Sequence, residues 1–144
     1  VLSGRKRPDG IARGGWKPEI HKDISQMATY LEVKEGNWFD IPLGALQSET
    51  LENLYGAGRM IWADDTAFAA VRVMGTCFAT GHAAGVAAAL QAKDRAAAEL
   101  RAKEHVAAAL QTADSMAAAF QAKTAEADFA GAVRRELLKQ GALI

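Results

Sequence analysis

The chain has 144 residues, half of them apolar, and its 17 basic residues balance 17 acidic ones. This length and composition are typical of one globular domain with a core of moderate size. Because the formal net charge is zero, no overall field attracts nucleic acid or an anionic membrane surface, and we expect neither partner.

Cysteine usage and the first residues indicate the compartment. Cys77 is the single cysteine, so an internal disulfide is excluded, and the sequence has no Cys and His cluster at metal-ligand spacing. No apolar core follows the basic residues of "VLSGRKRPDG", as a signal peptide would require. Charged residues interrupt the most apolar stretch, so no run reaches membrane-spanning length. We therefore expect a soluble, cytoplasmic protein.

The first fifty residues are rich in turn formers and predict short strands. "RPDG" (7–10) and "ARGGW" (12–16) are typical of turns. Segments 27–33 and 37–43 carry β-branched and aromatic residues, and "KEGN" between them has the length and the glycine of a hairpin loop. The sequence thus predicts an antiparallel hairpin, whose second strand is an edge strand or ends at Pro42.

Small residues are dense in the next segment. Residues 51–59 predict a short strand that ends in Gly56-Ala57-Gly58, and a helix is predicted to begin near Gly75 with Thr76 as its N-cap. Bare backbone and the positive end of a helix would then meet at one place. Since helix N-termini favour negative charge, this arrangement suits an electron-rich ligand. Tight packing alone is the alternative.

An alanine-rich segment repeats almost every ten residues. Between residues 83 and 128, 20 of 46 residues are Ala, and most of the others are strong helix formers. Ten residues fall about 80° short of three helical turns, so a long coiled coil is disfavoured. A tandem expansion of a helical segment and a partner-binding arm are both compatible with this pattern. Residues 129–144 predict a short closing helix with Gly141 in the C-cap position.

Four ordered motifs resemble a known family. "DGIARGGWKPEIHK", "FDIPLGAL", "NLYGAGR" and "AFAAVRVMGTCFATGHAAGVAAAL" are similar, in this order, to the C-terminal portion of FAD-dependent oxidoreductases of the glutathione-reductase-like superfamily, whose members have two dinucleotide-binding domains. The resemblance covers residues 1 to about 92 and 129–144. It implies an α/β fold, with short antiparallel strands, the closing strand and helix of an FAD-binding Rossmann-like domain, and an Ala-rich helical region.

The resemblance also implies site residues. Gly56, Ala57, Gly58 and Arg59 would lie against the ribityl and pyrophosphate region of FAD. The backbone N–H groups of Val73, Met74, Gly75 and Thr76 would face the pyrimidine edge of the flavin ring, which carries extra negative charge when the flavin is reduced.

Two side chains are implied near the reaction. Arg72 would lie beside the flavin or the substrate, or form a structural ion pair with Asp64 or Asp65. His21 would lie on the substrate side as a general base, or bind Glu19 or the backbone.

One family feature is missing from the sequence. It has no Gly-x-Gly-x-x-Gly fingerprint for the FAD pyrophosphate, so we expect a larger chain to supply that motif, and the abrupt start of the sequence agrees with this expectation. The expected organisation is a substrate-side β-rich region (1–50), the strand and helix of the FAD domain (51–95), a helical repeat insertion (96–128) and a closing helix (129–144).

The expected function is completion of an FAD and substrate site for hydride transfer from a small organic substrate. The alternative is a non-catalytic helical subunit that serves assembly with a larger partner.

Overall fold

The computed structural model describes residues 1–34, 38–109 and 129–143, and its strands form two small antiparallel sheets. Strand β1 (Gly10–Gly14) pairs with β4 (Phe39–Pro42), and β2 (Glu19–Ile20) pairs with β3 (Thr29–Tyr30). With its helices, this arrangement confirms the expected α/β class with short antiparallel strands.

The predicted hairpin of 27–33 with 37–43 is wrong. Its two segments contribute to different sheets, and the partner of β4 is the segment around Arg13 that the sequence predicted to turn. Burial explains the difference, because Ile11 of β1 and Phe39 and Ile41 of β4 are each almost fully buried in the core. Long-range apolar burial therefore outweighs the local loop signal.

The predicted strand over 51–59 is also wrong. Tyr55 makes one isolated bridge with Gln47, and the chain then enters a 3-10 turn, η2 (Gly58–Met60), which resembles the turn η1 (Leu43–Ala45) after β4. Gly58 adopts a φ of +62°, which takes the backbone out of the extended region.

Two helices meet at a sharp corner after this loop. Helix α1 (Asp65–Val71) was not predicted from the sequence, although Asp64 caps it by accepting a hydrogen bond from the Ala67 N–H. Helix α2 (Met74–Ala109) begins before the predicted N-cap, so Thr76 lies inside its first turn. The axes of α1 and α2 differ by 94°.

No single helix in the described ranges is both long and apolar enough to cross a membrane. The bent pair of α1 with α2 up to Glu104 passes such a test by length and composition alone. The predicted long helix is confirmed from residue 83 to residue 109, and the repeats at 110–128 lie outside the described residues.

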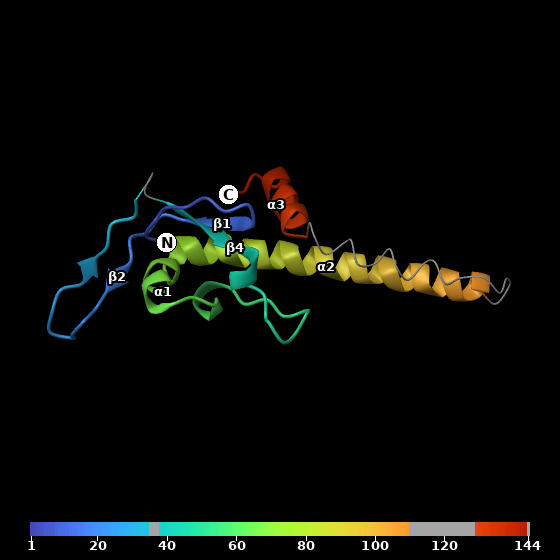
Figure 1. Cartoon of the computed structure of the whole chain (residues 1–144), viewed down its shortest axis with the longest axis horizontal. Coiled ribbons are helices and arrows are strands. Elements are labelled where there is room, and N and C mark those ends of the chain that lie inside the picture. Colours follow the sequence, from blue (N-terminus) through green and yellow to red (C-terminus); the bar gives the residue numbers. More distant parts are fainter. Residues whose placement is uncertain (35–37, 110–128, 144) are drawn as a thin grey trace.

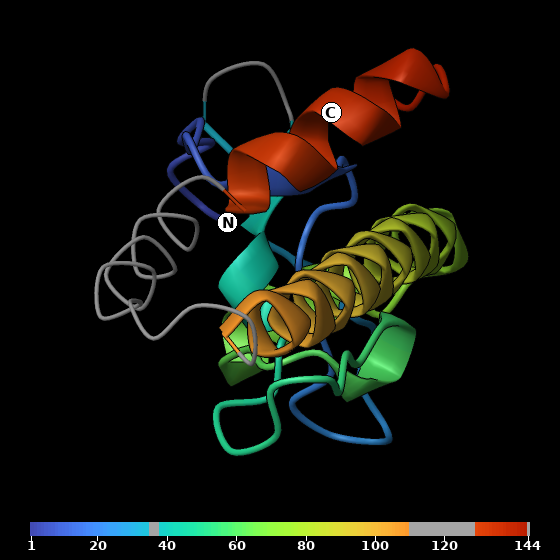
Figure 2. The ribbon, with the colours of Figure 1, turned by 90° about the vertical axis from the view of Figure 1, so that its right-hand side faces the viewer.

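The core lies at one end of α2. Figures 1 and 2 show the β1–β4 pair and α3 (Phe129–Lys139) gathered beside the first half of α2, while the far half of α2 projects from this body. Ala83 and Ala87 of α2 and Val133 and Leu137 of α3 are almost fully buried. Gly141 has a φ of +75° after α3 and confirms the predicted C-cap.

The fold predicts opposite responses for two adjacent leucines of α3. Leu137 is 1% exposed and Leu138 is 54% exposed. We expect Leu137→Ala to lower the free energy of unfolding by about 2–5 kcal/mol, because it opens a cavity in the core. Leu138→Ala is the matched control and changes it by less than about 1 kcal/mol. Urea unfolding of both variants measures the difference, and equal effects would contradict the placement of α3.

Candidate functional site

The Gly56–Arg59 segment lies against the first turns of α2. The backbone N–H of Gly58 donates a hydrogen bond to Thr80 Oγ1 at 3.1 Å. Thr80 is fully buried, and its hydroxyl is within 3.0 Å of the Thr76 carbonyl and 3.1 Å of the Cys77 carbonyl. The loop and the helix start are thus joined by a partly buried polar contact, which the sequence analysis did not identify. The sequence did offer one signal for this contact, because Thr80 lies one helical turn after Thr76.

Backbone conformation explains why residue 58 is glycine. Its φ of +62° is unfavourable for other residues, whereas a Cβ atom added there would make an ordinary contact with Cys77 Sγ at 3.4 Å. The Cys77 thiol itself is oriented toward the Arg72 carbonyl, 3.5 Å away. Residues 56–58 are therefore small where the loop passes over α2.

The first turn of α2 is open. Gly75 is exposed and no heavy atom lies within 4 Å of the place where a Cβ would be. The first N–H groups of a helix have no carbonyl partner within that helix and carry its positive partial charge. This turn therefore combines open space at Gly75 with the positive end of a helix.

Arg72 lies at the corner between α1 and α2. Its guanidinium donates to the Glu19 carbonyl of β2 at 3.4 Å, rather than pairing with Asp64 or Asp65, which are both in the described part of the chain. Arg72 therefore connects the start of α2 with the β2–β3 hairpin.

His21 follows β2 and lies beside Glu19, as the structural alternative for this residue anticipated. His21 Nε2 is 3.4 Å from Glu19 Oε1, and the Tyr30 hydroxyl donates to the same oxygen at 3.1 Å. This hydrogen bond raises the pKa of Tyr30, because Glu19 stabilises the protonated phenol. Sequence reasoning missed Tyr30, which the observed strand register places directly opposite Glu19.

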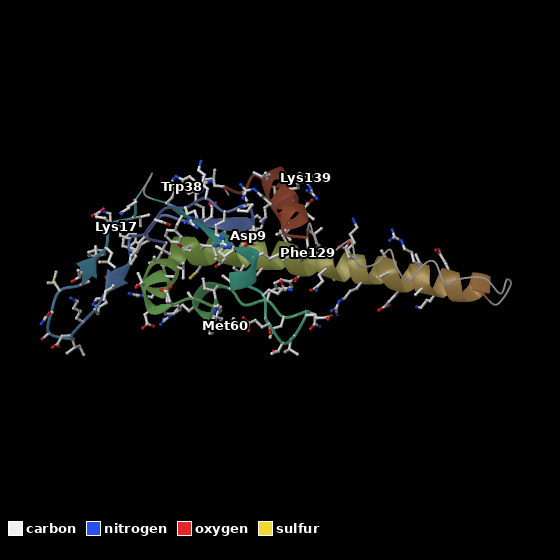
Figure 3. The ribbon with its side chains drawn as sticks, in the orientation of Figure 1. Asp9, Lys17, Trp38, Met60, Phe129 and Lys139 are labelled. Atoms are coloured by element: carbon white, nitrogen blue, oxygen red, sulfur yellow. The ribbon has the colours of Figure 1, made fainter. Side chains whose placement is uncertain are left out.

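Two pockets flank the helix start. One of about 420 Å³ borders the glycine loop and includes Tyr55, Gly56, Met60 and Trp62. The other, of about 590 Å³, includes Arg13, Trp38, Phe78 and His82. Figure 3 shows Trp38 and Met60 on opposite sides of α2.

The described residues include no group of three or more His, Cys, Asp or Glu side chains that could hold a metal ion. The structure brings the loop 56–59 to the start of α2, and Arg72 to the hairpin of His21. The roles of the named residues toward a cofactor or a substrate stay predictions.

Gly58 provides a test of the loop geometry. We expect Gly58→Ala to lower the free energy of unfolding by about 1–2 kcal/mol, because alanine is strained at positive φ. Gly44→Ala is the matched control, since an added Cβ there meets no atom within 4 Å. Thermal unfolding of the two variants is compared, and an unchanged Gly58→Ala protein would contradict the conformation of this loop.

Comparison with known proteins adds the family. Residues 1–113 match the family described as FAD dependent oxidoreductase. No curated protein and no solved structure matched the chain. The matched range includes the glycine loop, the α1–α2 corner and the hairpin of His21, so it contains each candidate site residue named above. The chain therefore belongs to the FAD dependent oxidoreductase family, and FAD is its cofactor.

Proposed function

We propose that this chain completes the flavin and substrate site of an oxidoreductase that transfers hydride from a small organic substrate to FAD. The observation that carries this proposal is the open first turn of α2. Its exposed Gly75 leaves room for a ring edge, and the N–H groups from Val73 to Thr76 lie at the positive end of a 36-residue helix. Loop residues Gly56–Arg59 hold the ribityl and pyrophosphate region from the adjacent side.

The chemistry divides between the cofactor and the side chains of the hairpin and corner. Bound FAD supplies the acceptor for the two electrons and the hydrogen that leave the substrate C–H bond. His21 accepts the accompanying proton from the substrate, and its half-exposed imidazole is accessible to a ligand. Arg72 anchors an anionic group of the substrate or the flavin carbonyl edge.

A larger chain that carries the glycine-rich pyrophosphate motif is the proposed partner. The described sheets each have two strands, whereas a dinucleotide-binding domain needs a larger sheet. One face of α2 is also left without cover: Met74 is 77% and Phe78 is 75% exposed. Gly81 and Gly85 continue that face by helical spacing and are open as well. An exposed apolar stripe with small residues suits close approach by another protein segment.

His21 is the first residue to test. In the FAD-loaded protein we expect His21→Gln to slow flavin reduction by substrate about 10²–10⁴-fold, because the base is lost. His82→Gln is the matched control, since His82 pairs with Gln140, the residue after α3, and lies away from the hairpin. Stopped-flow bleaching of the flavin measures both variants. Equal rates in wild type and His21→Gln would exclude His21 as the base.

The open face of α2 gives a second test. We expect Gly81→Leu to weaken retention of FAD by about tenfold or more, because overpacking a close contact costs about 1–3 kcal/mol. Ala98→Leu is the control, placed on the exposed far part of the same helix. Flavin absorbance after dialysis of the purified complex reports the difference.

The same preparation distinguishes the proposed function from the alternative. A stable complex that never binds flavin, with either residue at position 81, would favour a non-catalytic assembly subunit. The projecting half of α2 is the observation behind that alternative, because its side chains from Ala92 to Ala96 are all exposed.

A further inference from the structure

Glu19 occupies a central position that the proposed function leaves without a role. Its carboxylate oxygen Oε1 lies 3.4 Å from His21 Nε2 and accepts a hydrogen bond from the Tyr30 hydroxyl. Its backbone carbonyl accepts a hydrogen bond from Arg72. Groups from β2, β3 and the α1–α2 corner therefore converge on this one residue.

Strand geometry explains the convergence. Glu19 and His21 are two residues apart on an extended segment, so their side chains lie on the same face of the hairpin. Tyr30 is the cross-strand partner of Glu19 in the β2–β3 register, which places the phenol against the carboxylate. Arg72 reaches the same residue from the helix corner and ties the hairpin to the start of α2.

We propose that Glu19 is a positioning residue that fixes the neutral imidazole of His21 as the tautomer with hydrogen on Nε2. An unprotonated Nε2 would direct its lone pair at the Glu19 carboxylate, which is repulsive, whereas Nε2–H is attracted to it. The lone pair of the neutral ring is then on Nδ1, and this atom accepts the substrate proton. This assignment rests on the proposed function for the proton step alone.

Tyr30 limits the freedom of the carboxylate. Because the phenol donates to the same oxygen that faces His21, rotation of the Glu19 carboxylate breaks a hydrogen bond. Because Tyr30 and His21 share this acceptor, the orientation of the imidazole ring is restricted more than it would be by a single contact.

The contacts among Glu19, His21 and Tyr30 contribute little to the stability of the fold. His21 is 56% exposed and the Glu19 side chain is 23% exposed, and partly exposed ion pairs contribute little to folding. Substitution of Glu19 is therefore expected to leave the protein folded, so that its effect on the imidazole is measurable.

The same hairpin supplies a matched control. Glu32 pairs with Lys17 at 2.7 Å, and its side chain is 73% exposed. Glu32→Met thus removes a carboxylate and an ion pair of the hairpin without touching the Glu19 cluster. Glu19→Met removes the acceptor at similar side-chain length, and Glu19→Gln restores a neutral acceptor.

The test is NMR of the FAD-loaded protein with ¹⁵N-labelled histidine and ¹³C-labelled tyrosine, assigned through His21→Gln and Tyr30→Phe. In wild type and Glu32→Met we expect the neutral His21 ring to carry hydrogen on Nε2. In Glu19→Met we expect both tautomers, and the pKa of Tyr30 moves down toward its ordinary value because its acceptor is lost. Glu19→Gln recovers part of both signals.

Turnover provides the functional arm. Glu19→Met is expected to lower kcat by about tenfold or more with an unchanged flavin spectrum, and Glu32→Met by less than about twofold. If the His21 tautomers and the Tyr30 titration are the same in Glu19→Met and Glu32→Met, the inference is overturned. If the tautomers mix while turnover is unchanged, Glu19 does hold His21 but the proton step of the proposed function fails.

Discussion

The hydrogen bond from the Gly58 N–H to the Thr80 hydroxyl is the constraint on which this end of the molecule depends. It joins a loop at positive φ to a fully buried helical side chain, 22 residues later in the sequence. The hydrogen bond is partly buried, and a net contribution of about 0.5–1.5 kcal/mol is typical of such a bond, so it helps to hold the loop on the helix. The glycines at 56 and 58 and the first turn of α2 are consequently one structural unit.

The second feature of this end of the molecule is the right-angled corner between α1 and α2. Asp64 caps α1 by accepting a hydrogen bond from the Ala67 N–H, and this short helix ends at Val71. Helix α2 therefore starts in a new direction and has its own N-terminus. Arg72 at that corner reaches the Glu19 carbonyl. A continuous helix through residues 65–109 would have buried the first amides of α2 in its own hydrogen bonds. The break thus provides a second helix N-terminus, with its positive partial charge, at the corner that Arg72 connects to the hairpin.

Sequence reasoning succeeded where composition or local chemistry decides the structure. Alanine-rich segments form the long helix, Gly141 ends α3, and the start of α2 lies within two residues of the expected Thr76. It failed where the joint burial of residues that are distant in the sequence decides the structure. The pairing of β1 with β4 depends on Ile11 and Phe39 sharing a core with α2, and no local pattern encodes that partner. The Asp64 cap of α1 is a local signal in the sequence that the analysis of the sequence did not use.

The two ends of α2 are stabilised by different physics, and this separates the site from the repeats. Near the start, Ala83, Ala84 and Ala87 are buried and α2 contacts β1, so small side chains allow a close approach of helix and strand. From Gln91 to Glu104 the side chains are mostly exposed, and there the high intrinsic propensity of alanine, together with glutamate and lysine, maintains the helix without a core. A substitution at an exposed position such as Ala98 therefore acts mainly on helix content, while one in the packed half also disturbs the contact of α2 with β1. The boundary between the two halves is not sharp, because Gln91 donates a hydrogen bond to the Glu52 carbonyl and accepts one from the Tyr55 hydroxyl. The loop that leads into Gly56 therefore depends on the helix beyond its packed half as well.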